Sequence, residues 1–253
     1  MNTRERRQLI RERLQLQKKL MITELAQQID VSTMTIRRDF RRLIDLQIAT
    51  PIHGGIVFVE GGAAFPAVSA RERQMQREKN DIGNYCASLI KEGNAIYLDT
   101  GTTAMNIADA LLGRHDIAVL SHSLPVLNIL SHARDIQLIS VPGSYHPESK
   151  GFYGDLAVRM VRTFRLDIAF IGVSGINAEL GLMSPDLSDR ALKQAILETA
   201  RTKVLVVDHT KIGQESFSKI CGLQEIDQIV TDKQADPVFL NYARRQGVQV
   251  TQV

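Results

Sequence analysis

Short apolar runs that alternate with helix-like segments fill the chain from Asn94 onward and constrain its fold more than any other feature. Five of these runs have the length of a buried strand, namely AIYLD, IAVLS, QLISV, IAFIG and VLVVD. Alternation of this kind is typical of a parallel sheet covered by helices. We therefore predict a Rossmann-like parallel α/β domain over residues 71–253.

The residues that follow these five runs are small, hydroxyl-bearing or cationic. In an open α/β sheet the carboxyl ends of the strands form the ligand crevice, so the five loops should converge on one site. The residues that we expect to bind an effector there are Asp99, Gly101, Thr102, Thr103, Ser121, His122, Ser123, Gly143, Gly175 and Lys211.

The segment DTGTT at 99–103 is the strongest indication of a ligand. Gly101 lets the backbone turn sharply out of the strand, and Thr102 and Thr103 then open a helix whose free N–H groups can hold a phosphate. Lys211 supplies a cation for a phosphate or a sugar hydroxyl. An ordinary helix N-cap and a surface lysine are the alternative interpretations. Neither GxxxxGK[ST] nor GxGxxG occurs, which disfavours ATP and dinucleotides.

Other polar residues near the expected strand ends have simpler interpretations. Ser123 should cap a helix that has Pro125 near its start. Asp99 and Asp208 end strands and should order their own loops through backbone hydrogen bonds. Lys193, within DRALKQAILETA, is expected on a solvated helix face, although a place at the rim of the crevice is open to it.

Charge is distributed unevenly along the chain. Residues 1–58 hold eleven Lys and Arg against six Asp and Glu, a net of +5, so residues 59–253 carry a net of −2. The segment VEGGAAFPAVSA, rich in small residues, separates the two parts. We expect a domain with an anionic partner at 1–58, a linker at 59–70 and the second domain at 71–253.

Three helices are predicted in the basic part. The first covers Arg4 to about Gln15, the second is capped by Thr23, and the third, capped by Ser32, covers Thr33 to about Leu46. The turn at Ile29–Val31 between the last two is short and has an apolar residue at its joint. Two helices joined so tightly predict a helix-turn-helix.

The third helix has an apolar face and a basic face. Ile36, Phe40 and Leu43 fall on one stripe, whereas the single acid among the arginines, Asp39, lies near the core side. Because solvated faces usually alternate in sign, we favour DNA over plain solvent as the partner of the basic face. The expected DNA-binding residues of this helix are Ser32, Thr33, Met34, Thr35, Arg37, Arg38, Arg41 and Arg42.

The segment IATPIHGGIVFV contains two β-prone runs on either side of His53-Gly54-Gly55, which predicts a hairpin. Such a wing lies along the sugar-phosphate backbone and adds affinity without sequence information. We expect His53, Gly54 and Gly55 to bind DNA.

The run DVSTMTIRRDFRRL followed by HGG resembles the winged helix-turn-helix of DeoR-type bacterial transcriptional repressors. The segments DTGTT, GVSGI at 172–176 and VDHTKIG at 207–213 resemble the sensor domain of the same family, so the resemblance covers nearly the whole chain. The resemblance implies an isomerase-related sensor fold. It also implies a phosphorylated sugar bound by Gly101, Thr102, Thr103 and Lys211.

This chain departs from the family pattern at two places. The family usually has an arginine shortly before HGG, where this chain has Thr50-Pro51-Ile52. The family asparagine in the loop after the second strand is replaced by His122, which bears on the choice of sugar.

A sugar-phosphate isomerase is the alternative to a sensor. Such an enzyme needs a positioned general base, usually a carboxylate. Isomerases of this kind have acids in the stretch that here reads Gly172–Ile176, which contains none. Glu179, Asp186 and Asp189 lie in a loop and at a helix start, where acids commonly serve as caps. We therefore predict no enzyme activity, no catalytic residue and no cofactor.

Metal and membrane partners are not expected. The six histidines show no HxxxH spacing, and Cys86 and Cys221 lie in apolar settings that favour buried thiols. No stretch approaches roughly 18 apolar residues, and the N-terminus lacks the apolar core of a secretory signal. The chain is predicted to be a soluble, cytoplasmic protein.

The combined prediction is a repressor of a carbohydrate-utilisation operon that a sugar phosphate releases from its operator. One winged head buries only about 600–1,000 Å², so we expect a homodimer or homotetramer. The charged run RERQMQREK lies within an expected helix at about 69–91. A shift of that helix is a plausible route between the effector and the heads.

Overall fold

The computed structural model describes residues 6, 9–10, 13–14, 17–45, 49–58, 68 and 74–253. The chain forms two compact units, residues 1–66 and 67–253, each with its own apolar core. Apart from residue 68, the expected linker at 59–70 lies outside the described residues. Within the described part of the chain, no helix is both long enough and apolar enough to cross a membrane.

The N-terminal unit combines two described helices with a small antiparallel sheet whose strand order is β1-β3-β2. Its elements are β1 (Lys19–Met21), α2 (Ile22–Gln28), α3 (Thr33–Asp45), β2 (Ala49–Ile52) and β3 (Gly55–Phe58). The predicted helix-turn-helix and hairpin are therefore both present. Ile10 and Leu14, in the range of the first expected helix, are helical and fully buried, but most of that range lies outside the described residues.

Two details of this unit differ from the sequence-based prediction. The second helix begins at Ile22 and has Met21 at its N-cap, so Thr23 does not cap it. The helix begins two residues earlier than a cap at Thr23 implies, because it follows directly from β1, a strand that the sequence analysis did not predict. Strand β1 pairs with β3, and Ile22 N donates a hydrogen bond to Gly54 O (2.9 Å). This pairing attaches the wing to the start of the helix-turn-helix.

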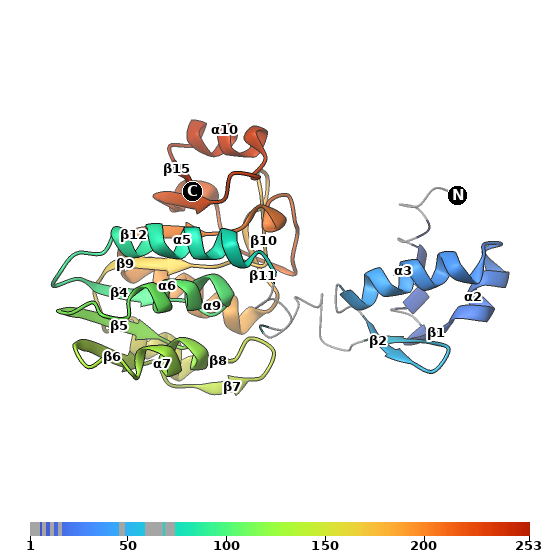
Figure 1. The fold of residues 1–253 in the computed structure, drawn as a ribbon, viewed down its shortest axis with the longest axis horizontal. Helices are drawn as coiled ribbons and strands as arrows, with labels where there is room; N and C mark the ends of the chain where they lie inside the picture. The colour runs from blue at the N-terminus through green and yellow to red at the C-terminus, as the bar shows by residue number, and fades with distance from the viewer. Residues whose placement is uncertain are drawn as a thin grey trace. The chain divides into compact units, whose positions relative to one another are not determined.

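The C-terminal unit is built on a seven-stranded sheet with the order β15-β14-β12-β9-β4-β5-β6 (Figure 1). All of its pairings are parallel. Its strands are β4 (Ala95–Leu98), β5 (Ile117–Ser121), β6 (Ile136–Ser140), β9 (Leu166–Ile171), β12 (Ala200–Val206), β14 (Gln228–Thr231) and β15 (Gln249–Gln252). The first five coincide with the five predicted runs, and the predicted parallel α/β fold is confirmed.

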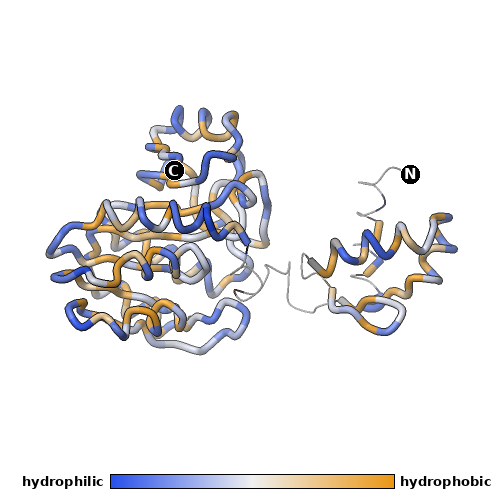
Figure 2. The backbone as a smooth tube through the Cα atoms, in the orientation of Figure 1, coloured by the Kyte–Doolittle hydropathy of each residue, from blue (hydrophilic) through white to orange (hydrophobic). Residues whose placement is uncertain are grey.

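Helices cover both faces of this sheet. Neighbouring strand residues alternate between the two cores, as Tyr97 packs in one while Ile96 and Leu98 pack in the other. One core contains residues of α5 (Gln76–Ser88), α6 (Thr102–Ala110) and α7 (Leu124–Leu130). The other contains residues of α8 (Asp155–Val161), α9 (Leu187–Thr199) and α10 (Pro237–Arg245). Figure 2 shows apolar residues concentrated along the strands that these helices cover.

Smaller elements lie in the loops that connect the strands of the sheet. They are the hairpin β7 (Ser144–His146) and β8 (Gly151–Tyr153), the sheet of β10 (Gly175–Asn177), β11 (Gly181–Ser184) and β13 (Ser218–Cys221), and two 3-10 turns, η1 (His209–Lys211) and η2 (Leu223–Glu225). The chain passes from β4 to β5 and β6 on one side, then returns to β9 and β12 on the other. The strand order therefore reverses between β4 and β9, where ligands bind in open α/β sheets.

Candidate functional site

The third helix separates its side chains as predicted. Ile36, Phe40 and Leu43 are at most 3% exposed and form the core of the N-terminal unit. The guanidinium-bearing residues Arg37, Arg38 and Arg41 are exposed. The side chain of Arg42 lies outside the described residues. Helix α3 thus turns its basic face to solvent because its apolar stripe is buried.

The N-terminal end of α3 has a hydrogen-bonded cap. Ser32 Oγ accepts from Thr35 N (3.2 Å) and lies 2.9 Å from Thr35 Oγ1, which confirms Ser32 as the cap. Ser32, Thr33 and Met34 are exposed, and Met34 shows 67% of its surface to solvent. A large apolar side chain is therefore exposed on the same helix as the arginines.

The acid that lies among the arginines of this helix, Asp39, is turned inward. Asp39 is 1% exposed, and its Oδ2 lies 2.6 Å from Arg6 Nε. The helix therefore offers its exposed arginines without this carboxylate beside them.

The three residues of the wing turn differ in their exposure to solvent. His53 and Gly54 are exposed, whereas Gly55 is buried. A Cβ on Gly55 would overlap the carbonyl oxygen of Leu20 in β1. Gly55 therefore contributes to the wing by allowing β3 to approach β1, and its side-chain position faces the protein.

The DTGTT segment follows β4 at the reversal of strand order. Gly101 has φ +110° and is the N-cap of α6, so the first N–H groups of the helix have no intrahelical acceptor. Asp99 Oδ1 accepts from Thr100 N (2.8 Å), and Asp99 Oδ2 accepts from Gly172 N (2.9 Å). Asp99 orders its own loop as predicted and also joins it to the loop after β9. Thr102 is buried, and Thr103 is half-buried.

Lys193 is a buried member of this site, so its expected place on a solvated face is wrong. Its Nζ lies 2.7 Å from both carboxylate oxygens of Asp189 and 3.4 Å from Asp99 Oδ2. The face of α9 that carries Lys193 packs against the sheet. The spacing of Asp189 and Lys193, four residues apart on one helix, is the signal that could have indicated an internal pair.

The acids before α9 have two different roles. Asp186 caps the helix by accepting from Asp189 N (2.8 Å), as predicted. Asp189 does not serve as a cap: its carboxylate is buried and accepts from Lys193 and from Ser184 Oγ (2.6 Å). The 172–176 stretch has no carboxylate, but the buried carboxylates of Asp99 and Asp189 lie in the same site and come from other elements.

His122 is fully buried beside this ion pair. Its Nδ1 lies 2.7 Å from the Tyr97 hydroxyl and its Nε2 lies 3.7 Å from Asp99 Oδ1. Within the described residues, Nε2 has no hydrogen-bond partner. Burial lowers the pKa of His122 to about 3, so the imidazole is neutral at physiological pH.

The charged groups of the cluster shift one another's pKa values. Burial raises the pKa of Asp99 to about 6, although Lys193 opposes the shift. Burial acts the same way on Asp189, but the Lys193 ammonium and its hydrogen bond hold the pKa of Asp189 below its usual value. Burial disfavours the charge of Lys193, yet the two carboxylates raise its pKa above normal. The centre therefore contains an ionised Asp189–Lys193 pair beside a readily protonated Asp99.

Asp99, His122 and Asp189 also place one ligand atom each within 4.8 Å of one another. Such a set fits a divalent cation in its donor types. Here, however, the Lys193 ammonium bonds to one carboxylate and lies near the other, which places a positive charge at the same position. The arrangement fits an uncharged polar group of a ligand better than a metal ion.

The loop after β5 is ordered from within. Ser121 Oγ donates to Leu98 O (2.8 Å) and accepts from Ser123 N (3.0 Å), and Ser123 Oγ accepts from Val126 N as the cap of α7. Both serine side chains are fully buried. They position His122 and hold the loop against β4.

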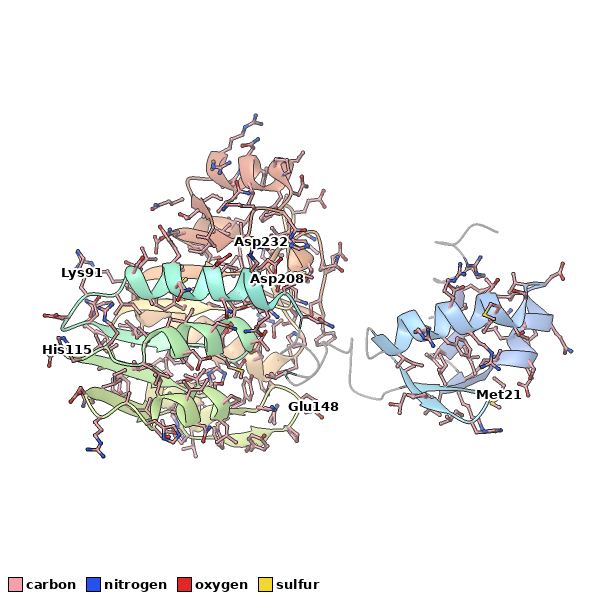
Figure 3. The ribbon with its side chains drawn as sticks, viewed as in Figure 1. Met21, Lys91, His115, Glu148, Asp208 and Asp232 are labelled. Carbon is pink, nitrogen blue, oxygen red and sulfur yellow. The ribbon has the colours of Figure 1, made fainter. Side chains whose placement is uncertain are left out.

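The loops after β9 and β12 are joined to each other. Gly213 N donates to Ile176 O (2.7 Å), and Gly175 packs against the Gln214 backbone. Lys211 lies half-buried on η1, which Asp208 caps by accepting from Thr210 N (3.0 Å). Asp208 thus orders its own loop as predicted. Figure 3 shows Asp208 beside Asp232, which follows β14.

Two tyrosines of this site were missed by the sequence analysis. Tyr97 is an inward residue of β4 and touches His122, and Tyr153 on β8 packs its ring edge-on against His122, with 4.9 Å between centroids. Gly143 packs against the Tyr153 backbone at the base of the hairpin. Tyr97 could have been found from its place two residues before Asp99, whereas Tyr153 follows a segment with no strand signal.

The two cysteines are buried, as predicted. Burial raises the pKa of the Cys86 thiol, and it raises that of Cys221 to about 12. Both thiols are therefore poor nucleophiles.

An arginine-faced winged helix joined in one chain to a parallel α/β unit with a buried polar cluster at its strand ends is the arrangement of a two-domain transcriptional regulator. Two family models match the chain: the DeoR-like helix-turn-helix domain over residues 6–61 and the DeoR C terminal sensor domain over residues 74–233. The chain belongs to the DeoR family.

Curated relatives match nearly the whole chain. The HTH-type transcriptional regulator YgbI of Escherichia coli (strain K12) is 34% identical over 90% of this chain and 89% of its own length. The putative aga operon transcriptional repressor of Escherichia coli O157:H7 is 29% identical over 98% and 93%. The glycerol-3-phosphate regulon repressor of Escherichia coli (strain K12) is 30% identical over 83% and 82%.

Solved structures show a partial likeness. Ribose 5-phosphate isomerase A from Methanocaldococcus jannaschii aligns with a TM-score of 0.41 and 18% identity over 55% of each chain. The β subunit of eIF2B from Chaetomium thermophilum aligns with a TM-score of 0.44 and 12% identity over 64% of this chain and 49% of that one. This chain therefore spans about half the length of each of these proteins.

Proposed function

We propose that this protein represses a carbohydrate-utilisation operon and that a phosphorylated sugar releases it from its operator. The observation that carries the proposal is the exposure of Arg37, Arg38 and Arg41 on α3, together with the exposed wing turn of the same unit. Two of the relatives are named as a putative aga operon repressor and a glycerol-3-phosphate regulon repressor, which supports the carbohydrate assignment.

In this proposal α3 enters the major groove of operator DNA. Ser32, Thr33, Met34 and Thr35 lie at the N-terminal end of the helix, where recognition helices meet base edges. The arginines pair with guanine or with phosphates, and the turn at His53 and Gly54 follows the backbone. The operator lies in the cytoplasm, where we place the protein. Two or four copies act together because one head makes too few contacts.

The effector in this proposal binds at the reversal of strand order. Its phosphate is held by the N–H groups and hydroxyls of Gly101, Thr102 and Thr103, with Lys211 as the cation. Its sugar hydroxyls reach toward Asp99 and the unpartnered Nε2 of His122. The neutral imidazole can donate or accept a hydrogen bond, and the carboxylate can accept one. Both groups therefore suit the uncharged hydroxyls of the sugar.

Isomerase activity is the second candidate function. It is favoured by one observation: Asp99, with a pKa of about 6, lies 3.4 Å from Lys193 in a buried site. A carboxylate with such a pKa is suited to proton transfer near neutral pH. Against this, Asp99 is held by two backbone N–H groups, and the relatives are transcriptional regulators. We propose that the protein is not an enzyme.

The test is operator binding with a matched arginine control. DNA upstream of the gene and of its neighbours is titrated at low salt by fluorescence anisotropy. Arg38→Ala should weaken binding by roughly 1–3 kcal/mol, whereas Arg159→Ala, on the exposed surface of α8, should leave it unchanged. A panel of ribose 5-phosphate, sn-glycerol 3-phosphate and hexosamine 6-phosphates is then added to seek release.

Turnover separates the two candidates. The regulator is supported by operator binding without conversion of ribose 5-phosphate to ribulose 5-phosphate. Conversion by a protein that ignores every DNA fragment would establish the enzyme instead.

A further inference from the structure

The hairpin of β7 and β8, residues 144–153, is joined by its backbone to the effector loops. Phe152 N donates to His122 O (2.9 Å), and Leu124 N donates to Lys150 O (2.9 Å). The second strand of the hairpin therefore lies along the loop after β5. Any change in the position of that loop is carried directly into the hairpin.

The same strand packs on the residue that precedes the phosphate-binding turn. Tyr153 OH lies 3.4 Å from Thr100 Oγ1, and the Tyr153 ring covers His122. A Cβ on Gly151 would lie only 2.6 Å from Thr100 Cγ2, so β8 and Thr100 are already in close contact. Thr100 is bonded directly to Gly101. A ligand that shifts this turn must therefore push on β8 or draw it in.

The tip of the hairpin holds the start of the sensor unit. Val68 N donates to Glu148 O (3.0 Å), and the Val68 side chain is 1% exposed. Figure 3 shows Glu148 at the β7–β8 hairpin. The Tyr153 ring packs against His146 in the opposite strand, with 4.8 Å between centroids, and Ser149, next to Glu148, donates from its hydroxyl to His146 O (3.5 Å). Val68 is the second residue of the unit that begins at 67, and the chain before it leads into the DNA-binding unit.

These contacts form a short physical connection. It runs from Thr100 to the Tyr153 hydroxyl, from the Tyr153 ring to His146 and Ser149, and from the neighbouring Glu148 carbonyl to Val68. We propose that the hairpin 144–153 transmits effector occupancy to the DNA-binding unit, with Tyr153 as the positioning residue that links the phosphate-binding turn to the hairpin tip. The proposal rests on the proposed function and specifies how its site is regulated.

Helix α5 offers a competing route. Gln76 Nε2 donates to Asn106 Oδ1 (3.0 Å), and Asn106 lies one turn beyond the phosphate-binding end of α6. However, α5 packs into the same buried core as α6, so the two helices move with the body of the domain. The hairpin instead contacts both Thr100 and Val68, which lies within the expected linker.

Three variants separate the routes. Tyr153→Phe removes the hydroxyl and keeps the ring, Tyr145→Phe removes a hydroxyl from an exposed ring on the other hairpin strand, and Gln76→Ala breaks the α5 contact. Affinity for each sugar phosphate of the panel is measured by calorimetry, and operator affinity by anisotropy with and without the sugar phosphate that binds.

We expect Tyr153→Phe to reduce the effect of that ligand on operator affinity at least about fivefold when the operator is titrated at saturating ligand. Tyr145→Phe and Gln76→Ala should respond as the unmodified protein does. A full response in Tyr153→Phe would overturn the proposal, as would loss of response in Gln76→Ala with Tyr153→Phe unaffected.

A second measurement needs no ligand. Gly151→Ala pushes β8 away from Thr100, so the amide of Val68 should exchange its hydrogen about tenfold faster. Operator affinity should change in the same variant, while circular dichroism confirms that it is folded. Unchanged exchange and unchanged operator affinity in folded Gly151→Ala would overturn the coupling. If the unmodified protein binds none of the sugar phosphates, the effector assignment fails, and this measurement still decides the role of the hairpin.

Discussion

At the residue scale, the centre of the sensor unit combines charges that an apolar interior disfavours. The Lys193 ammonium is stable there because it bonds to both oxygens of Asp189 and lies near Asp99. His122 is tolerated because it stays neutral and bonds to Tyr97. Each group depends on its neighbours, so the loss of one partner leaves an uncompensated charge or dipole in the interior.

Replacing Lys193 with Met should therefore destabilise the protein strongly. The change leaves two carboxylates buried without their cation, and the free energy of unfolding should fall by about 3–5 kcal/mol at pH 7.5. Urea unfolding measures the loss. Arg159→Met is the matched control, because Arg159 pairs with Asp155 at the same spacing on an exposed helix surface and should cost about 0.5 kcal/mol or less. Equal stability losses in the two variants would contradict this account.

The pH dependence of stability should show that His122 is buried in its neutral form. The pKa of His122 in the folded protein, about 3, lies below its ordinary value of 6.5, so at pH 5 the unfolded chain binds a proton that the folded chain excludes. Between pH 7.5 and 5, the unfolding free energy of the unmodified protein should fall by about 2 kcal/mol relative to His122→Asn. Parallel unfolding curves at both pH values would show that His122 is not buried in its neutral form.

Asp99 acts on stability in the opposite direction. Its folded pKa of about 6 exceeds the ordinary 3.8, so its contribution is present below pH 3.8 and is lost as the pH rises through 6. Because Asp99 is present in both proteins, comparison of the unmodified chain with His122→Asn isolates the histidine.

At the scale of elements, the wing depends on close approach of two strands. Strand β3 lies between β1 and β2, and Gly55 begins it where a side chain would meet Leu20. In the hairpin β7–β8, Gly151 likewise leaves no room for a side chain beside Thr100. In both places the strand lies so close to a neighbouring segment that there is no room for a side chain, so the position requires glycine for steric reasons.

Gly55→Ala should therefore destabilise the N-terminal unit. Overpacking at such a contact costs about 1–3 kcal/mol, and the wing should separate from β1. Operator affinity and the thermal transition of the N-terminal unit should both fall, while the sensor unit keeps its sugar-phosphate affinity. Retained operator affinity with an unchanged thermal transition would show that the strands accommodate the methyl group.

At the scale of the whole molecule, two units with separate cores must share one regulatory equilibrium. Among the described residues, each apolar core is built from residues of one unit. Communication therefore depends on differential binding: the effector must prefer the arrangement of the protein that operator DNA disfavours.

Reciprocity between the two ligands follows from this linkage. If a sugar phosphate lowers operator affinity by a factor between about 5 and 150, saturating operator should lower sugar-phosphate affinity by the same factor. Calorimetry of the sugar phosphate with and without operator duplex measures it, with a scrambled duplex as the control. A one-sided effect would mean that the two ligands do not share an equilibrium.

Much of this organisation can be predicted from local sequence patterns. The buried strands, the two faces of α3, the Ser32 and Asp186 caps and the turn after Asp99 were all predictable, because each depends on residues close together in the chain. The same is true of the order of the two domains. These features follow from periodicity and from the conformational preferences of short segments.

Other features were decided by tertiary structure alone. The burial of Lys193 depends on which face of α9 meets the sheet, and its second carboxylate comes from Asp99, 94 positions earlier in the chain. The contact of Val68 with Glu148 joins segments that share no local pattern. Local sequence determines which elements form, but only their packing determines which distant charges and backbone groups meet, because those contacts depend on the positions of several elements at once.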